Sequence, residues 1–133
     1  MAEDGNRSDM AHRFADALHR LEDTRDVEPM ASLFTDDADV SNPLVKHEDE
    51  GKQGARDFWT KYRASFDEIK STFRHIVTHE EEGAGFLEWV SEGSMAGQPV
   101  RYGGVSVIDF EGDRVTAFRT YFDPTQLRHA QKA

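Results

Sequence analysis

One histidine is well placed to carry a proton in this chain. In the stretch around it apolar and polar residues alternate, and Lys70 and Arg74 mark the face turned to solvent. The alternation predicts a strand with Phe73, His75 and Val77 pointing inward. An imidazole titrates near neutral pH, so His75 is the candidate acid or base of a catalytic site. The alternatives are a buried histidine that only hydrogen-bonds a neighbour and a histidine near the pocket rim in contact with water.

Two further polar residues stand immediately before prolines. Asn42 precedes Pro43, whose ring holds it extended, and its amide is then aimed at a pocket mouth or ties down local backbone. Asp123 precedes Pro124, and alternation places it on the face opposite Thr120. Asp123 is therefore a candidate acid only if a one-residue bulge reverses that face. Otherwise it caps the turn.

The spacing of the histidines argues against a metal site. His75 and His79 are four residues apart, which on a strand separates them by about 13 Å. The chain has no cysteine, so thiolate ligands are excluded. The acidic run 47–50 is read as part of a solvated loop, Leu44–Gln53, with a weak cation site or a mobile lid as alternatives. We expect neither a metal nor a cofactor.

Composition excludes several classes of partner. The chain has 133 residues with 16 Lys and Arg against 26 Asp and Glu, a net charge of −10. Such a surface repels nucleic acid. No apolar run approaches the roughly 20 residues that cross a bilayer, and Met1–Met10 is too acidic for a leader. We expect one cytoplasmic domain over 1–133, with 1–7 and 125–133 as tails.

The periodicity predicts three helices followed by four strands. The first helix starts at Ser8, the second follows an Asp26 cap, and the third, opened by Gly54, carries a wide aromatic stripe. An extended piece, Asp36–Val40, lies between the second and third helices. The period then changes to two, with turns that predict an antiparallel meander ending at Phe122. The expected class is α+β, with the helices on one face of a curled sheet.

The strands also indicate which face is buried. Glu88 and Glu92 mark the outer face of the second strand, so Leu87, Trp89 and Ser91 point inward. The last two strands are apolar on both faces. Because an apolar outer face is often covered by a second copy, we predict a homodimer packed through the sheet.

Three motifs in order resemble one known superfamily. They are LFTDDADVSNP at 33–43, the GKQGARDFW start of the third helix at 51–59, and the closing VTAFRTYFDP at 115–124. Together they resemble the nuclear transport factor 2-like superfamily, and more narrowly its SnoaL-like branch. The resemblance implies a cone: a curled sheet wrapped around a long helix, with an apolar pocket open at one end. That superfamily includes isomerases, cyclases, dehydratases, epoxide hydrolases and binders, so fold alone does not give function.

The resemblance also allows a check of catalytic positions, and most are substituted here. Phe14, Asn42 and approximately Ser106 stand where ketosteroid isomerases have a tyrosine and two aspartates. Thr120 stands where SnoaL-type cyclases have their acid/base aspartate, and Val105 near their histidine. Asn42 matches the cyclases.

The epoxide hydrolase positions are substituted as well. Trp89, Ser91 and Thr120 replace the charged residues of limonene-epoxide hydrolases, and Val40 takes the position of a tyrosine. Epoxide opening of that type needs two carboxylates to share proton transfer. The chain thus keeps the scaffold without the usual acid and base.

Three functions remain open from the sequence. The first is a lyase, isomerase or cyclase that acts on an apolar oxygenated ring compound, with His75 as acid/base and Asn42 and Thr120 orienting the substrate. The second is a non-catalytic binder of a hydrophobic small molecule. The third is a dimerisation module with a filled cavity. The residues expected to line the pocket are Phe14, Leu18, Val40, Trp59, Phe73, Trp89, Ser91, Val105, Thr120 and Phe122.

Overall fold

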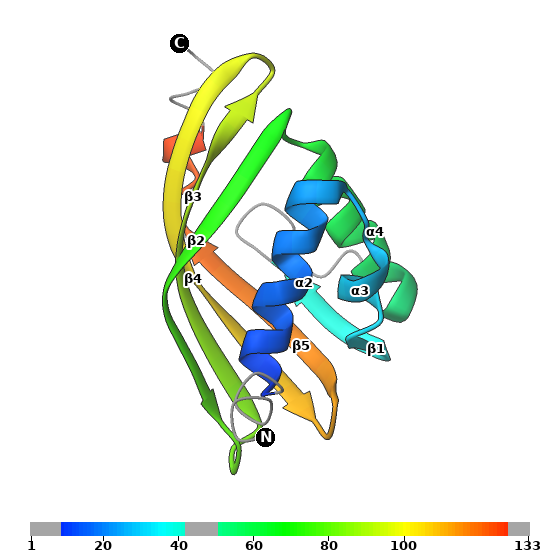
Figure 1. Ribbon diagram of the computed structural model, residues 1–133. Coiled ribbons are helices and arrows are strands. Elements are labelled where there is room, and N and C mark those ends of the chain that lie inside the picture. The colour runs from blue at the N-terminus through cyan, green and yellow to red at the C-terminus, as the bar shows by residue number, and fades with distance from the viewer. Residues whose placement is uncertain (1–8, 42–50, 128–133) are drawn as a thin grey trace.

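The α+β class predicted from the sequence is confirmed by a computed structural model, which describes residues 9–41 and 51–127 (Figure 1). The helices and one strand occupy the first half of the chain, and four strands make up most of the second half. In chain order the elements are α2 (Met10–Thr24), α3 (Glu28–Ala31), β1 (Phe34–Ser41), α4 (Gly51–Ala64), β2 (Glu68–His79), β3 (Ala84–Met95), β4 (Gln98–Glu111) and β5 (Arg114–Phe122).

The sheet has five strands in the order β1-β5-β4-β3-β2. Strands β2 to β5 form the predicted antiparallel meander. The expectation of four strands is wrong, because the piece that the sequence indicated only as extended is a fifth strand. It pairs in parallel with β5, with Val40 opposite Phe118. Three aspartates within β1 obscure its pattern, although Ala38 and Val40 are fully buried.

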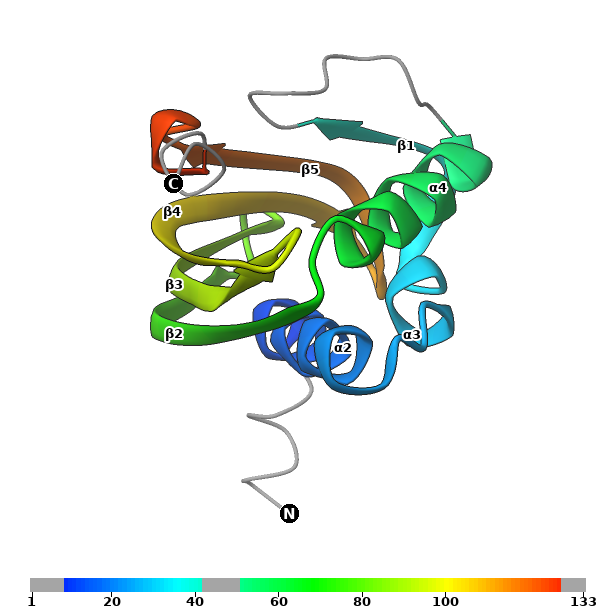
Figure 2. The same cartoon turned by 90° about the horizontal axis from the view of Figure 1, so that it is seen from above.

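The two long helices lie on the concave side of the sheet. Helix α2 packs against β2 at one edge, and α4 packs against β1 at the other (Figure 2). Asp9 caps α2, because its carboxylate accepts the backbone N–H of His12 at 3.0 Å. Helix α4 begins at Gly51, earlier than the Gly54 expected from the sequence.

A β-bulge in β2 changes which of its residues point inward. Phe73 pairs with Trp89, but the next paired residue on β2 is His75, opposite Glu88. Arg74 is therefore an extra residue, and the alternation reverses after it. The prediction that His75 and Val77 point inward is wrong for this reason.

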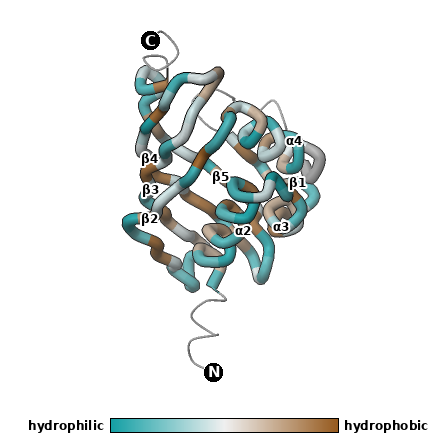
Figure 3. Tube along the Cα trace, turned by 45° about the horizontal axis from the view of Figure 1, so that its top comes forward, coloured by the Kyte–Doolittle hydropathy of each residue, from teal (hydrophilic) through white to brown (hydrophobic). Residues whose placement is uncertain are grey.

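Buried apolar residues form two clusters. The larger joins α2, α4, β1 and the inner face of β3 to β5, and the smaller includes Phe66, Trp89, Tyr102 and Leu127. Leu127 lies in a helical turn where the sequence predicted a polar tail. Figure 3 shows hydrophobic and hydrophilic residues alternating along the strands, as a sheet with one buried face requires. Among the described helices, none has the length and apolar character to cross a membrane.

Candidate functional site

A cavity of about 180 Å³ lies between the two apolar clusters. Residues from α2, α4 and all four meander strands line it, together with the turn that follows β5. Its wall is dominated by aromatic rings, several of them in edge-to-face contact with one another. The aromatic lining residues are Phe14, Phe58, Trp59, Tyr62, Phe66, Phe73, Trp89, Tyr102, Phe118 and Phe122.

Most of the residues expected to line a pocket do line this cavity. They are Phe14, Leu18, Trp59, Phe73, Trp89, Ser91, Thr120 and Phe122. Two do not. Val40 is completely buried in the larger cluster, beneath α4, rather than in the cavity wall. Val105 is on the outer face and 39% exposed, because alternation along β4 turns its neighbour Ser106 inward instead.

The polar residues singled out for catalysis are not brought together in the cavity. His75 is on the outer face of the sheet, where its side chain is 75% exposed and its Nδ1 lies 2.7 Å from Glu88 Oε1. Asp123 is exposed and accepts hydrogen bonds from the backbone N–H and hydroxyl of Thr125, at 3.0 and 2.7 Å, so it caps the turn. Asn42 lies outside the described residues, as does most of the segment Leu44–Gln53 that was expected to be a solvated loop.

One polar part of the wall is a chain of hydroxyls on β4 and β5. The indole N–H of Trp89 donates to Ser106 Oγ at 2.9 Å, and Ser106 Oγ lies 2.9 Å from Thr120 Oγ1. Thr120 in turn donates to the Val105 carbonyl oxygen at 3.3 Å. Gly104 allows this arrangement, because a Cβ at that position would lie 2.8 Å from Trp89 Cζ2.

The second polar part centres on a carboxylate that the sequence analysis did not single out. Glu22, near the end of α2, is only 2% exposed. Its Oε2 accepts hydrogen bonds from the hydroxyls of Tyr62 at 2.7 Å and Ser71 at 2.6 Å, and its Oε1 accepts the backbone N–H of Ser71 at 2.9 Å. Ser71 Oγ also lies 2.6 Å from Ser91 Oγ. Tyr62, Ser71 and Ser91 all line the cavity, so this carboxylate is connected to it.

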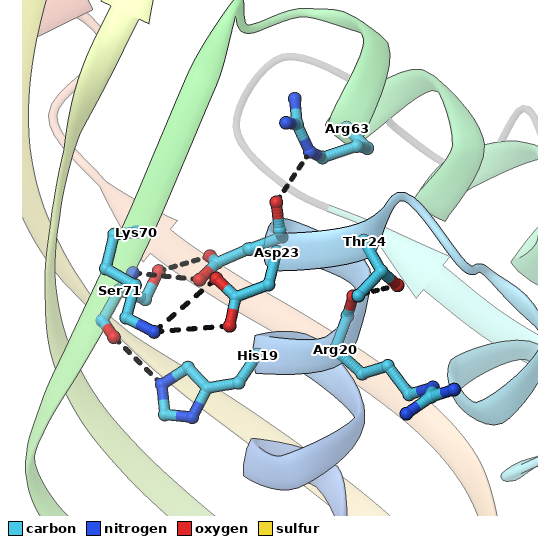
Figure 4. Close-up of polar contacts among 8 residues, drawn as sticks. His19, Arg20, Asp23, Thr24, Arg63, Lys70 and Ser71 are labelled. Atoms are coloured by element: carbon cyan, nitrogen blue, oxygen red, sulfur yellow. Dashed lines mark hydrogen bonds and ion pairs between the residues drawn. The ribbon is translucent and has the colours of Figure 1, made fainter.

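Strand β2 and helix α4 hold the end of α2 in place around that carboxylate. Figure 4 shows Ser71 on β2, His19 on α2 and Arg63 on α4 converging there. His19 Nε2 lies 2.9 Å from the Ser71 carbonyl oxygen. The buried guanidinium of Arg63 donates to the backbone carbonyl of Glu22 at 3.1 Å and to that of Phe66 at 2.9 Å.

The two tyrosines of the wall remain protonated phenols. Burial raises the pKa of Tyr62 well above its ordinary value, and the negative charge of Glu22 raises it further. Burial and the same charge also raise the pKa of Tyr102. Within the described part of the chain, the Tyr102 hydroxyl has no hydrogen-bond partner. The buried Trp59 Nε1 likewise has none there.

A signal for Glu22 was present in the sequence. The apolar face of α2 carries Phe14 and Leu18, and Glu22 continues that face at the next i+4 position. A carboxylate on an apolar helix face must be paired when it is buried. The hydroxyls that satisfy it come from residues 40 and 49 positions away, and helical spacing alone does not indicate them.

The cavity combines an apolar aromatic wall with hydroxyl groups at one side. Aromatic walls can stack on rings, and the hydroxyls at one side can orient a polar substituent. Across residues 9–41 and 51–127, no group of three or more His, Asp or Glu side chains is placed to hold a metal ion.

Comparison with known proteins gives one family and many similar folds. The sequence model of the SnoaL-like domain matches residues 11–118. No curated protein matches the chain. An NTF2-like protein from Anabaena variabilis has a similar structure, with a TM-score of 0.76 at 22% identity over 86% of this chain and 87% of that one.

Two further solved structures are similar at lower identity. An LEH-like epoxide hydrolase from M. tuberculosis has a TM-score of 0.72 at 15% identity, covering 92% of this chain and 90% of that one. A protein from Catenulispora acidiphila with a ketosteroid isomerase-like fold was solved in complex with trimethylamine. Its structure has a TM-score of 0.77 at 12% identity, covering 90% of this chain and 92% of that one. At these identities the likeness establishes the fold.

Proposed function

The chain belongs to the SnoaL-like domain family, and from this premise we propose that it binds a small apolar ring compound bearing oxygen and acts on it as a lyase, isomerase or cyclase. The observation that supports the proposal is the aromatic cavity of about 180 Å³ with a buried carboxylate behind its polar wall. An apolar cavity of about 150 Å³ accepts benzene. The size therefore suits a compound of one or two rings.

Glu22 is the acid/base group in this proposal. It is a carboxylate held away from water, and it hydrogen-bonds two side chains of the cavity wall, Tyr62 and Ser71. General acid/base catalysis needs a proton-carrying group within reach of the substrate, directly or through a hydroxyl. The outward position of His75 does not meet that requirement.

Binding can be measured directly, because both tryptophans line the cavity. Titration with non-absorbing one- and two-ring alcohols and ketones should quench or shift the fluorescence of Trp59 and Trp89 in a saturable way. The variant Ser91→Leu, which fills part of the cavity, should abolish that response, whereas Ser32→Leu, on the exposed surface after α3, should retain it. Equal responses from the two variants would show that the cavity is not the binding site.

Turnover is tested separately, by mass spectrometry and chromatography of the bound compounds after incubation. A non-catalytic binder is the second candidate. The observations that favour it are that the hydroxyls of Ser71, Ser106 and Thr120 are already bonded to other protein groups, and that no carboxylate lines the cavity among the residues that the structure describes. Saturable binding with every compound recovered unchanged would favour the binder, and an isomer or dehydrated product would favour the enzyme.

We also propose that the outer face of the sheet packs on a second copy. Four large apolar residues are exposed there, one on each meander strand, and they form two cross-strand pairs: Val77 opposite Phe86 and Val105 opposite Tyr121. A patch of this kind suits an isologous dimer. Sedimentation equilibrium should give a dimer mass. Val105→Glu should give a monomer, while the remote Ser32→Glu should leave the dimer intact.

A further inference from the structure

The hydrogen-bond chain from Glu22 into the cavity has a fixed direction. An ionised carboxylate can only accept, and both Tyr62 and Ser71 place their hydroxyl oxygens within 2.7 Å of Glu22 Oε2. The Ser71 hydroxyl therefore gives its single proton to Glu22. Since Ser71 and Ser91 are also hydrogen-bonded, at 2.6 Å, Ser91 must be the donor in that pair.

The direction of this chain decides what Ser91 can offer to a ligand. Its proton points to Ser71, so only oxygen lone pairs remain for the cavity that it lines. The hydroxyl of Tyr62 likewise donates its single proton to Glu22. This part of the wall therefore accepts hydrogen bonds and does not donate them through either residue.

Tyr102 supplies the complementary group. It is the register partner of Ser91 on the neighbouring strand, and it lines the same cavity. Its hydroxyl is a donor without a partner among the described residues. A ligand hydroxyl that contacts both residues can satisfy both, because its proton can go to Ser91 while its oxygen accepts from Tyr102.

We propose that the cavity selects ring compounds that carry a free hydroxyl, and that Glu22 sets this selectivity by fixing the direction of the Ser71–Ser91 hydrogen bonds. The inference rests on the binding function proposed above. A ketone of the same skeleton has no proton for Ser91, so one lone pair of a buried hydroxyl is left facing a carbonyl oxygen. Leaving a buried polar group unsatisfied lowers affinity by about tenfold.

The test compares 2-tetralol with 2-tetralone, which share one two-ring skeleton and differ in the oxygen function. Dissociation constants are measured by isothermal titration calorimetry for the intact protein, with tetralin as the parent hydrocarbon. We expect 2-tetralol to bind about tenfold more tightly than 2-tetralone. Equal affinities, or tighter binding of the ketone, would overturn the inference.

Variants identify which residue sets the preference. In Glu22→Gln an amide N–H₂ replaces one acceptor oxygen, so Ser71 can turn its proton towards Ser91 and Ser91 can donate to the ligand. The tenfold preference for the alcohol should then disappear or reverse. Asp23→Asn makes the same chemical change at the next residue, which faces solvent and contacts Lys70 at 3.5 Å, and should keep the preference. An unchanged preference in a folded Glu22→Gln protein would contradict the role of Glu22.

The outcomes separate this inference from the function on which it depends. If all three compounds bind with equal affinity, the cavity is a binding site and the hydroxyl selectivity is wrong. If none binds, not even tetralin, the proposed binding function fails for compounds of this size, and the selectivity fails with it. The comparison of alcohol and ketone needs only the unmodified protein, so a variant that does not fold leaves the test intact.

Discussion

Replacing Glu22 by glutamine should destabilise the protein by about 3 kcal/mol. The amide keeps the volume of the carboxyl group and one acceptor oxygen, so the bond from the Ser71 backbone N–H can persist. The other oxygen, which accepts the hydroxyls of both Tyr62 and Ser71, becomes an N–H₂ group that accepts neither. Hydrogen bonds to a charged group contribute about 1.5–3 kcal/mol each. Two of them at the lower limit, because hydroxyls can rotate, give the expected value.

The assay is urea unfolding followed by tryptophan fluorescence, with Asp23→Asn as the matched control. Asp23 and Lys70 form an exposed ion pair at 3.5 Å, and such pairs contribute about 0–1 kcal/mol. The free energy of unfolding should therefore fall clearly in Glu22→Gln and hardly at all in Asp23→Asn. A loss below about 1 kcal/mol in Glu22→Gln, similar to that of its control, would refute the view that the buried carboxylate holds α2, α4 and β2 together.

Three further substitutions test other parts of the structure. Gly93→Ala should prevent stable folding, because its Cβ would lie 1.9 Å from the carbonyl oxygen of Glu68; a normal thermal unfolding curve would contradict this. His75→Ala should change neither ligand affinity nor stability by more than about 0.5 kcal/mol, since that side chain is exposed; calorimetric titration and urea unfolding check both. Asp9→Ala should cost about 1 kcal/mol of stability at neutral pH through loss of the helix cap. Although burial raises the pKa of Asp9, hydrogen bonds from His12 lower it overall, so wild-type Asp9 stabilises the fold above the ordinary aspartate value of 3.8 and loses that effect as the pH falls through its lowered pKa. Urea unfolding at several pH values should show the two proteins converging in acid; a constant difference would argue against the cap.

Residue patterns of short range predicted much of the fold. Glu88 and Glu92 were expected to face water, and from this Leu87, Trp89 and Ser91 were correctly predicted to point inward. The same reasoning placed Phe73 of β2 in the cavity wall, because one face of the sheet is buried and alternation has a period of two. The helical stripes were equally clear.

Features that depend on distant parts of the chain were not predicted. The parallel pairing of β1 needs β5, some 80 residues away, and its aspartates resemble a loop. The bulge at Arg74 has no residue signature, and it moved His75 to the outer face. Glu22 was missed because the hydroxyls that make its burial tolerable are supplied by α4 and β2.

The bulge in β2 also bears on how this fold can change in length. Removing Arg74 is a single-codon deletion, and it would restore strict alternation along β2. The pairs on either side of the bulge, Phe73 with Trp89 and His75 with Glu88, would keep their register, so each residue would keep the face that it has now. The face of each side chain in the second half of β2 is therefore set by its pairing with β3, and not by its distance along the chain from Phe73. Loss of the extra residue would shorten the strand by one position and leave the lining of the interior unchanged.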